Sequence, residues 1–401
     1  MLLLAWAAVA TLPTAGTRAG VLGRSILTFG ILRLYLRPMG NATSKLFDTF
    51  RLGAIELSTR TVMAPMTRSR ATADHVPTPI MVEYYRQRSG AGLIITEGVA
   101  PSPNGVGYPR IPGIYNTEQV EAWKPIAEAV HRADGRIFMQ LMHTGRISHP
   151  LNMPEGSQVL APSAVAAAQT EMYTDQEGNK DLPTPRAMTT ADIQHAIGEY
   201  VTAARNAIAA GFDGVELHGA NGYLIEQFIN PAANRRSDAY GGSARKRTQF
   251  AVEVARAVVD AIGADRVGIR LSPGGVANDL VPFDDQQETY HILAGKLREI
   301  GVVYVHIVDQ SAMGAPEVPL DLKTMIRDTF GGTIILSGGY DKARAEADLE
   351  SGLGHLVAFG RPFLANPDLV ERMKRDAALN ELDTATMYTP GEAGYLDYPV
   401  L

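Results

Sequence analysis

The sequence contains no cysteine among its 401 residues. This absence excludes disulfide bonds, thiolate zinc sites, cysteine-ligated iron–sulfur clusters and a cysteine nucleophile. Any redox chemistry must therefore come from a bound cofactor, and thiols give no information about the compartment.

An excess of positive charge is also missing. The net charge is −6 and the pI is about 5.9, with acidic and basic residues interspersed, so we expect no nucleic-acid partner. The opening stretch MLLLAWAAVA is apolar but too short to cross a bilayer, and it lacks the basic start of a secretory signal. We therefore expect no stable membrane insertion.

Short runs rich in Val, Ile and Leu recur along the chain, separated by segments with helical periodicity. The runs have the length of strands buried on both faces. They cover 61–66, 92–98, 136–141, 214–219, 266–272, 302–308, 333–339 and 355–360. Helices are expected over 78–89, 117–133, 189–211, 243–262, 284–300, 319–329, 340–351 and 366–377. Thr190 is a candidate N-cap and Gly211 a candidate stop for the third of these helices.

Eight strands, each followed by a helix, predict an α/β fold of the (β/α)8 TIM-barrel type, because parallel strands need helical crossovers. An open doubly wound sheet is the alternative. It would carry a glycine fingerprint in the first strand–helix turn, where this sequence has APMTRS.

One connection, after the third strand, is far longer than usual. Residues 143–189 are rich in Pro, Gly and polar residues and have little periodicity. We expect this insertion to cap the catalytic mouth or to be a mobile segment; an inert insertion is the alternative.

The first 38 residues differ from the rest because they contain four arginines and no acidic residue. An arginine-bearing, acid-free leader is typical of an organellar transit peptide. The alternative is that translation starts at Met39 and the upstream residues are non-native. We therefore divide the chain into a leader of residues 1–38 and one barrel domain of residues 39–401. The expected location is the cytoplasm, or an organelle if the leader is a transit peptide.

Barrel enzymes carry their active sites at the C-terminal ends of the strands. After the seventh and eighth strands stand Gly338, Gly339, Gly360 and Arg361. Open backbone N–H groups and a guanidinium at these two strands can bind phosphate, so we expect a cofactor or substrate that carries one. The other candidates at strand ends are Pro65, Met66, Thr67, Gly98, Gln140 and Arg270.

Gln140 and Arg270 suit the edge of a pyrimidine-like ring that gains negative charge on reduction. Taken singly, each would more often be a structural hydrogen-bonding group.

The fourth strand ends in the stretch GVELHGANGY, which places His218, Asn221 and Tyr223 within six residues. Imidazole and amide N–H groups can converge on one oxygen and stabilise the charge that develops there. The Tyr223 phenol stays protonated at neutral pH and can act as a general acid. Each residue alone has a structural explanation, but the combination predicts catalysis.

Eight ordered motifs carry a resemblance to a known family. They are MAPMTRSR (63–70), EYYRQRSGAGLIITEG (83–98), QLMHTGRISHP (140–150), GFDGVELHGANGYLIEQFINPAANRRSDAYGGS (211–243), RVGIRLSPGG (266–275), SGGY (337–340), AFGRPFLANPDL (358–369) and GYLDYP (394–399). With these motifs the sequence resembles the old yellow enzyme family of FMN-dependent ene-reductases, most closely its N-ethylmaleimide reductase-like branch. The resemblance runs from about Lys45 to the C-terminus.

The resemblance implies a barrel that holds FMN, takes hydride from NADPH or NADH, and reduces the C=C bond of electron-poor alkenes, namely α,β-unsaturated carbonyl or nitro compounds. It implies that Thr67, Gln140 and Arg270 bind the flavin ring, and that Gly339, Gly360 and Arg361 bind its phosphate. His218 and Asn221 would bind the activating oxygen, Tyr223 would protonate the α-carbon, and Tyr388 would line the pocket. No metal is implied, and a monomer or a homo-oligomer is compatible.

Four positions bear on the comparison with the family. Met142 stands where the family usually has tryptophan, and Met387 where it often has phenylalanine, so we expect a more deformable pocket. Asn221 is histidine in many members. Thr67 instead of cysteine argues against the thiol-tuned branch.

Three other functions were weighed. A metal-dependent barrel hydrolase would need a close histidine pair after the first strand, which is missing. A non-enzymatic flavin-binding protein would have no need of Tyr223. A barrel like that of dihydroorotate dehydrogenase typically uses a Cys or Ser base, and the chain has no Cys.

Overall fold

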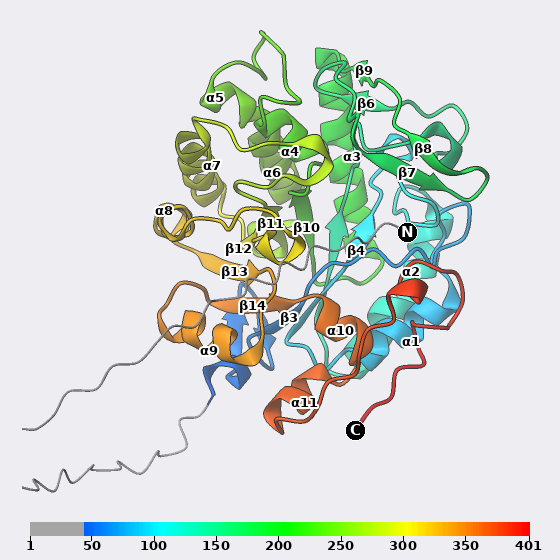
Figure 1. Ribbon diagram of the computed structural model, residues 1–401, viewed down its shortest axis with the longest axis vertical. Coiled ribbons are helices and arrows are strands. Elements are labelled where there is room, and N and C mark those ends of the chain that lie inside the picture. The colour runs from blue at the N-terminus through cyan, green and yellow to red at the C-terminus, as the bar shows by residue number, and fades with distance from the viewer. Residues whose placement is uncertain (1–43) are drawn as a thin grey trace, which may run out of the picture. The chain divides into compact units, whose positions relative to one another are not determined.

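Eight parallel strands close into a barrel, as predicted (Figure 1). The computed structural model describes residues 44–401, which form one unit, so the expected leader and its boundary at Met39 lie outside the described residues. The barrel strands are β3 (Thr61–Met63), β4 (Leu93–Val99), β5 (Ile137–Leu141), β10 (Gly214–Gly219), β11 (Val267–Leu271), β12 (Tyr304–Val308), β13 (Thr333–Ser337) and β14 (Leu356–Phe359).

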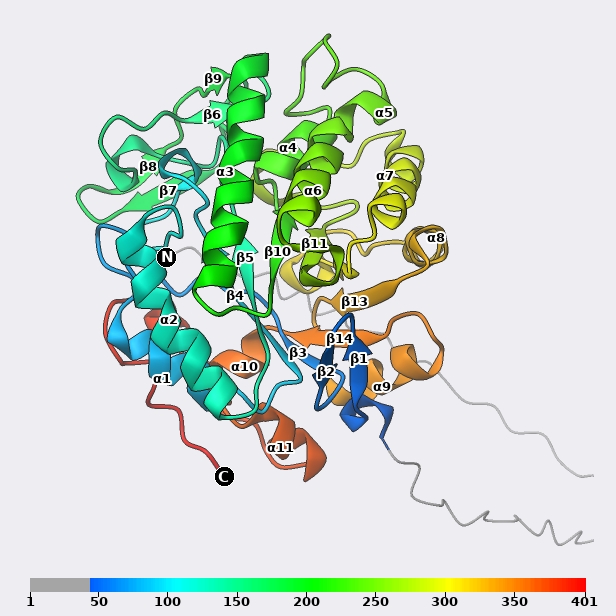
Figure 2. The ribbon, with the colours of Figure 1, turned by 180° about the vertical axis from the view of Figure 1, so that it is seen from behind.

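Helices follow the strands and surround the barrel (Figures 1 and 2). They are α1 (Pro79–Gln87), α2 (Thr117–Arg132), α3 (Thr190–Ala209), α4 (Leu224–Ile229), α5 (Ala244–Arg247), α6 (Gln249–Ile262), α7 (Gln286–Ile300), α8 (Leu320–Phe330), α9 (Lys342–Glu350), α10 (Arg361–Ala365) and α11 (Leu369–Lys374). The short helices α4 and α10 were not predicted, because neither is long enough to show a helical period. Within residues 44–401, no helix combines the length and apolar character needed to span a bilayer.

The cap of α3 differs from the prediction by one residue. Thr189, and not Thr190, is the N-cap, and its hydroxyl accepts a hydrogen bond from the backbone N–H of Asp192 at 3.1 Å. The Asp192 carboxylate in turn accepts from the backbone N–H of Thr189 at 2.7 Å, which completes a capping box. The carboxylate at the third helical position selects Thr189 from the two adjacent threonines.

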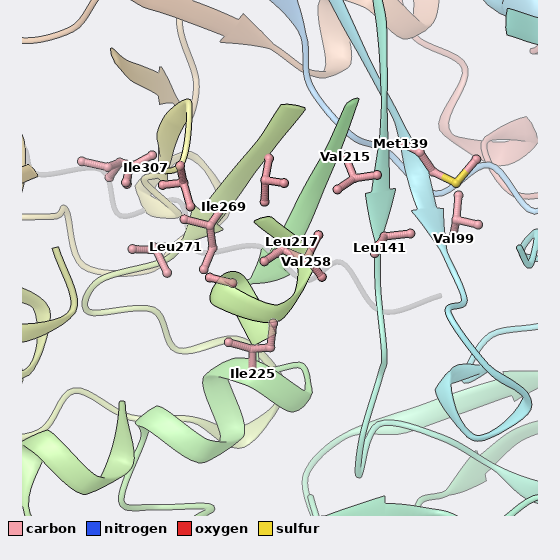
Figure 3. Packing of buried hydrophobic residues seen from close by; sticks show 14 of the residues in the cluster. Val99, Met139, Leu141, Val215, Leu217, Ile225, Val258, Ile269, Leu271 and Ile307 are labelled. Carbon is pink, nitrogen blue, oxygen red and sulfur yellow. The ribbon is translucent and has the colours of Figure 1, made fainter. Parts of the chain in front are cut away.

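Side chains alternate between the two faces of each barrel strand. On β5, Met139 and Leu141 pack outward against the helices, whereas Phe138 belongs to a separate cluster inside the barrel. Figure 3 shows part of the outer cluster, with side chains of neighbouring strands together with Ile225 of α4 and Val258 of α6. The same alternation directs Gln140 inward, above Phe138.

The lower half of the barrel interior is apolar and close-packed. Phe138 and Tyr304 lie with their ring centroids 5.9 Å apart. A Cβ atom on Gly214 would lie 2.5 Å from the Phe138 ring, so this strand position must be glycine. A hairpin of β1 (Phe50–Leu52) and β2 (Ile55–Leu57) adds Leu52 and Leu57 to the same cluster and closes the N-terminal end of the barrel. The buried polar network described below lies above this cluster, in the upper half of the barrel.

The predicted insertion follows β5 and contains regular structure. Strand β6 (Leu160–Ala161) pairs with β9 (Arg186–Ala187), and β7 (Glu171–Thr174) forms a hairpin with β8 (Gly178–Asp181). Its buried apolar residues pack against Met142 and Tyr223. The insertion thus covers the flank on which Tyr223 lies, and no residue of 143–189 lines the cavity described below.

Phe138 supplies much of the packing inside the barrel, so Phe138→Ala should destabilise the fold by about 3–5 kcal/mol. The measurement is the urea midpoint of unfolding followed by circular dichroism. Tyr173→Ala, at a side chain that is 53% exposed, is the control and should leave the midpoint nearly unchanged. Equal midpoints for the two variants would contradict this account of the core.

Candidate active site

The carboxyl ends of the barrel strands open into one cavity of about 460 Å³. Every site residue predicted from the sequence lines it: Pro65, Met66, Thr67, Gly98, Gln140, His218, Asn221, Tyr223, Arg270, Gly338, Gly339, Gly360, Arg361 and Tyr388. Met142 and Met387 line it as well. The strand-end positions therefore meet in space, as the barrel topology requires.

A buried polar network lies directly below the cavity. The fully buried carboxylate of Glu216, on β10, accepts a hydrogen bond from Gln140 Nε2 at 2.8 Å. Its other oxygen lies 2.8 Å from His306 Nδ1, and His306 Nε2 lies 2.9 Å from Ser337 Oγ. Burial lowers the pKa of His306, with the Glu216 carboxylate acting in the opposite direction. The Glu216 carboxylate thus links three strands, and His306 extends the network to a fourth.

This network fixes which atoms remain for a ligand. Because Gln140 directs its NH2 group at Glu216, its amide oxygen is left as a free acceptor. Arg270 has a buried Nε atom without a hydrogen-bond partner among residues 44–401. Burial lowers the pKa of Arg270, and the nearby Glu216 carboxylate opposes this shift. An acceptor and an unpaired guanidinium donor together fit a planar ring with N–H and carbonyl groups on one edge.

Two glycines after β13 adopt conformations that other residues avoid. Gly338 has φ +122° and Gly339 has φ +63°, and a Cβ atom on Gly339 would lie 2.7 Å from the Ala312 Cβ. At the end of the adjacent strand β14, Arg361 is exposed and begins α10 after Gly360. Backbone N–H groups and a guanidinium therefore border the same end of the cavity, an arrangement that suits a phosphate.

Gly98 has a different reason to be glycine. A Cβ atom at this position would lie 2.5 Å from the Met142 sulfur, so the floor of the cavity depends on close approach of the β4 backbone to Met142.

The turn that carries Asn221 is held on both sides. Asn221 has φ +57°, its backbone N–H donates to Ser272 Oγ at 2.9 Å, and its C=O accepts from Asn278 Nδ2 at 2.7 Å. The next residue, Gly222, donates its N–H to the buried Glu226 carboxylate at 2.7 Å. Asparagine tolerates this left-handed conformation better than most residues.

The tautomer of His218 follows from a backbone contact. The N–H of Ala220 donates to His218 Nδ1 at 3.3 Å, so the neutral ring carries its proton on Nε2. Burial lowers the pKa of His218 well below its ordinary value, and the charges of Arg270 and His306 act in the same direction. His218 is therefore a neutral donor at physiological pH.

Tyr223 stands beside His218, with ring centroids 4.8 Å apart in a perpendicular arrangement. Its hydroxyl lies 2.9 Å from the hydroxyl of Tyr108. Burial raises the pKa of Tyr223 well above its ordinary value, and the neighbouring Tyr108 adds to the increase. The phenol therefore keeps its proton throughout the neutral range.

A segment after the last helix forms part of the cavity wall. Arg70 donates to the backbone C=O groups of Met387 at 2.7 Å and Thr386 at 2.8 Å. Arg68 donates to the C=O of Gly394 at 2.6 Å, and the buried Tyr395 ring stacks on Tyr84 at 4.0 Å. These contacts place Met387 and Tyr388 at the cavity.

Sequence reasoning missed the residues after the fifth and sixth strands. Ala277 and Asn278 follow β11, while Asp309 and Gln310 follow β12, and all four line the cavity. The strand-end rule that found the other candidates also applies to 309 and 310, directly after the run VVYVHIV. It would not have found Asn278, which is six residues beyond the end of its predicted strand.

A model of the NADH:flavin oxidoreductase / NADH oxidase family matches residues 45–380. The chain belongs to this family. The matched range includes all eight barrel strands.

Named relatives share about two-fifths of their residues with this member of the family. The 12-oxophytodienoate reductase 1 of Oryza sativa subsp. japonica is 42% identical over 365 residues, covering 90% of this chain and 94% of that protein. A protein of Leishmania infantum, named probable flavin mononucleotide-dependent alkene reductase, is 41% identical over 371 residues, covering 90% of this chain and all of that protein.

Solved structures agree with the fold. Morphinone reductase superposes with a TM-score of 0.86 at 43% identity, covering 89% of this chain and 96% of that one. The old yellow enzyme homologue from Zymomonas mobilis superposes with a TM-score of 0.85 at 40% identity, covering 89% of this chain and all of that one. Morphinone reductase has also been solved in complex with tetrahydroNAD.

The chain is therefore an FMN-dependent oxidoreductase that uses a reduced nicotinamide, as expected from its sequence. The cavity fits FMN, because two polar atoms that have no partner among residues 44–401 match the pyrimidine edge of the flavin. They are the buried Nε of Arg270 and the amide oxygen of Gln140. The glycines after β13 and Arg361 would hold its phosphate.

Arg361→Ala should weaken retention of FMN, because it removes the guanidinium from the phosphate end of the cavity. We expect about a tenfold or larger increase in the Kd for FMN, since a hydrogen bond to a charged group contributes roughly 1.5–3 kcal/mol. The measurement is the flavin released on serial dilution and ultrafiltration. Arg375→Ala, on the exposed end of α11, is the matched control, and equal retention in both variants would remove the phosphate assignment.

Proposed function

We propose that the enzyme reduces the C=C bond of α,β-unsaturated carbonyl or nitro compounds, with His218 and Asn221 binding the activating oxygen and Tyr223 as proton donor. The observation that carries the proposal is the side-by-side arrangement of a neutral histidine donor and a protonated phenol in the cavity. The relative named as an alkene reductase supports the same class of substrate.

The bound FMN would supply the hydride that it has received from NADPH or NADH. The chain's own contribution begins with the substrate oxygen, on which negative charge develops when hydride reaches the β-carbon. His218 Nε2–H and the Asn221 amide would donate to that oxygen and stabilise the charge. Because His218 is neutral, it would act as a hydrogen-bond donor and retain its proton.

Tyr223 would complete the reaction by protonating the α-carbon. Its raised pKa keeps the phenolic proton in place until this step. The Arg270 charge, which lowers the pKa of Tyr223, would stabilise the phenolate formed in this step.

The substrate range follows from the side chains that line the cavity. Met142 and Met387 lie on the cavity surface, and methionine adapts its shape more readily than an aromatic ring. We therefore infer that the pocket accepts alkenes of varied shape.

Tyr223→Phe removes the proton donor but leaves the flavin-binding residues in place. Reduction of the flavin by NADPH should stay within about twofold of wild type, whereas reoxidation by 2-cyclohexenone should slow by roughly 10²–10⁴-fold. Anaerobic stopped-flow absorbance of the flavin measures both half-reactions.

Tyr173→Phe, an exposed tyrosine outside the cavity, is the matched control and should leave both rates unchanged. Equal slowing of both half-reactions in Tyr223→Phe would contradict the role of proton donor.

The pH dependence of reoxidation tests the protonation states. The His218 pKa lies below, and the Tyr223 pKa above, the usual values of about 6.5 and 10. Both neutral forms therefore persist between about pH 6 and pH 9, so neither residue should contribute a titration to the rate of flavin reoxidation by the enone over this window. A titration near pH 6.5 that disappears in His218→Asn would show that His218 is protonated in the ordinary range.

A further inference from the structure

We propose that Gln310 is a positioning residue, which locks the Asn221 amide with Nδ2 toward the cavity. The site then offers two fixed donors and recognises an oxygen that can only accept, such as a carbonyl, nitro or phenolate oxygen. This inference rests on the proposed function, because it specifies which group the site binds.

The side chain of Gln310 is oriented by a backbone contact. Gln310 follows β12, is 4% exposed, and its Oε1 accepts from the backbone N–H of Val276 at 3.2 Å. The two ends of an amide side chain are assigned from their hydrogen-bond partners. A backbone N–H can only donate, so the Gln310 atom that faces Val276 must be oxygen. Gln310 Nε2 consequently points the other way.

The orientation of Gln310 in turn determines the orientation of the Asn221 amide. Gln310 Nε2 donates to Asn221 Oδ1 at 2.8 Å. Because an NH2 group can only donate, Asn221 must offer its oxygen to Gln310, and Nδ2 is left for a ligand. The backbone bonds of Asn221 to Ser272 and Asn278 keep the residue from moving out of reach.

A backbone N–H group sets the donor polarity of both oxygen-binding residues. The donor polarity of His218 is set by the backbone N–H of Ala220, and that of Asn221 by the backbone N–H of Val276 through Gln310. An asparagine with a free side chain could rotate and accept a hydrogen bond from a ligand N–H or O–H. With Gln310 in place that option is lost, so ligands that present a hydrogen at this position are excluded.

Binding of 4-chlorophenol to the oxidised FMN-loaded protein tests the proposal, since its phenolate oxygen needs two donors. The Kd is measured from the change in flavin absorbance for Asn221→Ala, Gln310→Met and the double variant. Asn221→Ala should weaken binding about tenfold and Gln310→Met by roughly threefold to tenfold. The double variant should be no weaker than Asn221→Ala alone, because Gln310 acts through Asn221.

Gln310→Glu gives a second, independent outcome. A carboxylate can still accept from Val276 but can no longer donate to Asn221, so the Asn221 amide should reverse and present its oxygen to the ligand. Binding should be weaker than in Gln310→Met. When Asn221 is also replaced by alanine, the Kd values of Gln310→Glu and Gln310→Met should differ only by the effect of the added negative charge.

Two results would overturn the proposal. If the Kd changes of Gln310→Met and Asn221→Ala multiply in the double variant, Gln310 contacts the ligand itself. If both Gln310 variants bind as tightly as wild type, the amide of Asn221 is oriented without it. Gln249→Met, the same substitution on α6, is the matched control and should leave the Kd unchanged.

The proposed ene-reduction and the role of Gln310 are tested by different measurements. Turnover of 2-cyclohexenone by the wild type tests the proposed ene-reduction, whereas the binding measurements use oxidised protein and need no turnover. Turnover with multiplicative Kd changes would leave ene-reduction standing and remove the role of Gln310. If the Kd changes do not multiply and the wild type shows no turnover, the role of Gln310 would stand and ene-reduction would be removed.

Discussion

The buried carboxylate of Glu216 is the constraint on which the upper half of the barrel depends. A charge-bearing group in the middle of a buried strand is costly unless it is fully hydrogen-bonded. Gln140 provides one of those bonds from the adjacent strand β5, and His306 provides the other from β12, beyond β11. The Arg270 guanidinium, on β11, lies near enough to be influenced by the Glu216 charge. The barrel therefore changes from a packed apolar interior to a polar floor within one layer of side chains, and the cavity begins there.

In several places the hydrogen-bonding polarity of a cavity side chain is set by a buried neighbour that can only donate or only accept. Glu216 decides which end of Gln140 is free, and the N–H of Ala220 decides which nitrogen of His218 carries the proton. None of these assignments needs a ligand to be present. His218 thus presents a hydrogen-bond donor along one wall of the cavity, and Gln140 presents an acceptor toward a ring edge on its floor. Little rearrangement is therefore required on binding.

The eight strands were predictable because each is an apolar run bounded by turns, and the strand-end rule then located most of the cavity. Asn278 could not be found in this way, since its position depends on contacts distant in sequence. It has φ +56°, and the adjacent Asp279 accepts hydrogen bonds from Gln169 at 2.7 Å and Thr170 at 3.1 Å, both in the long insertion. The cap position at Thr189 was missed by one residue, although the sequence held the signal: Asp192 stands at the capping-box spacing from Thr189, whereas Ile193 stands at that spacing from Thr190.

The wall formed by residues 386–394 has a consequence for biosynthesis. Its backbone is held by Arg68 and Arg70, which lie just after the first barrel strand, so the two ends of the fold meet at the cavity. All eight strands must be synthesised before Met387 and Tyr388 can take their places. The residues that border the phosphate end, up to Arg361, are therefore synthesised before the segment that completes the wall around the substrate.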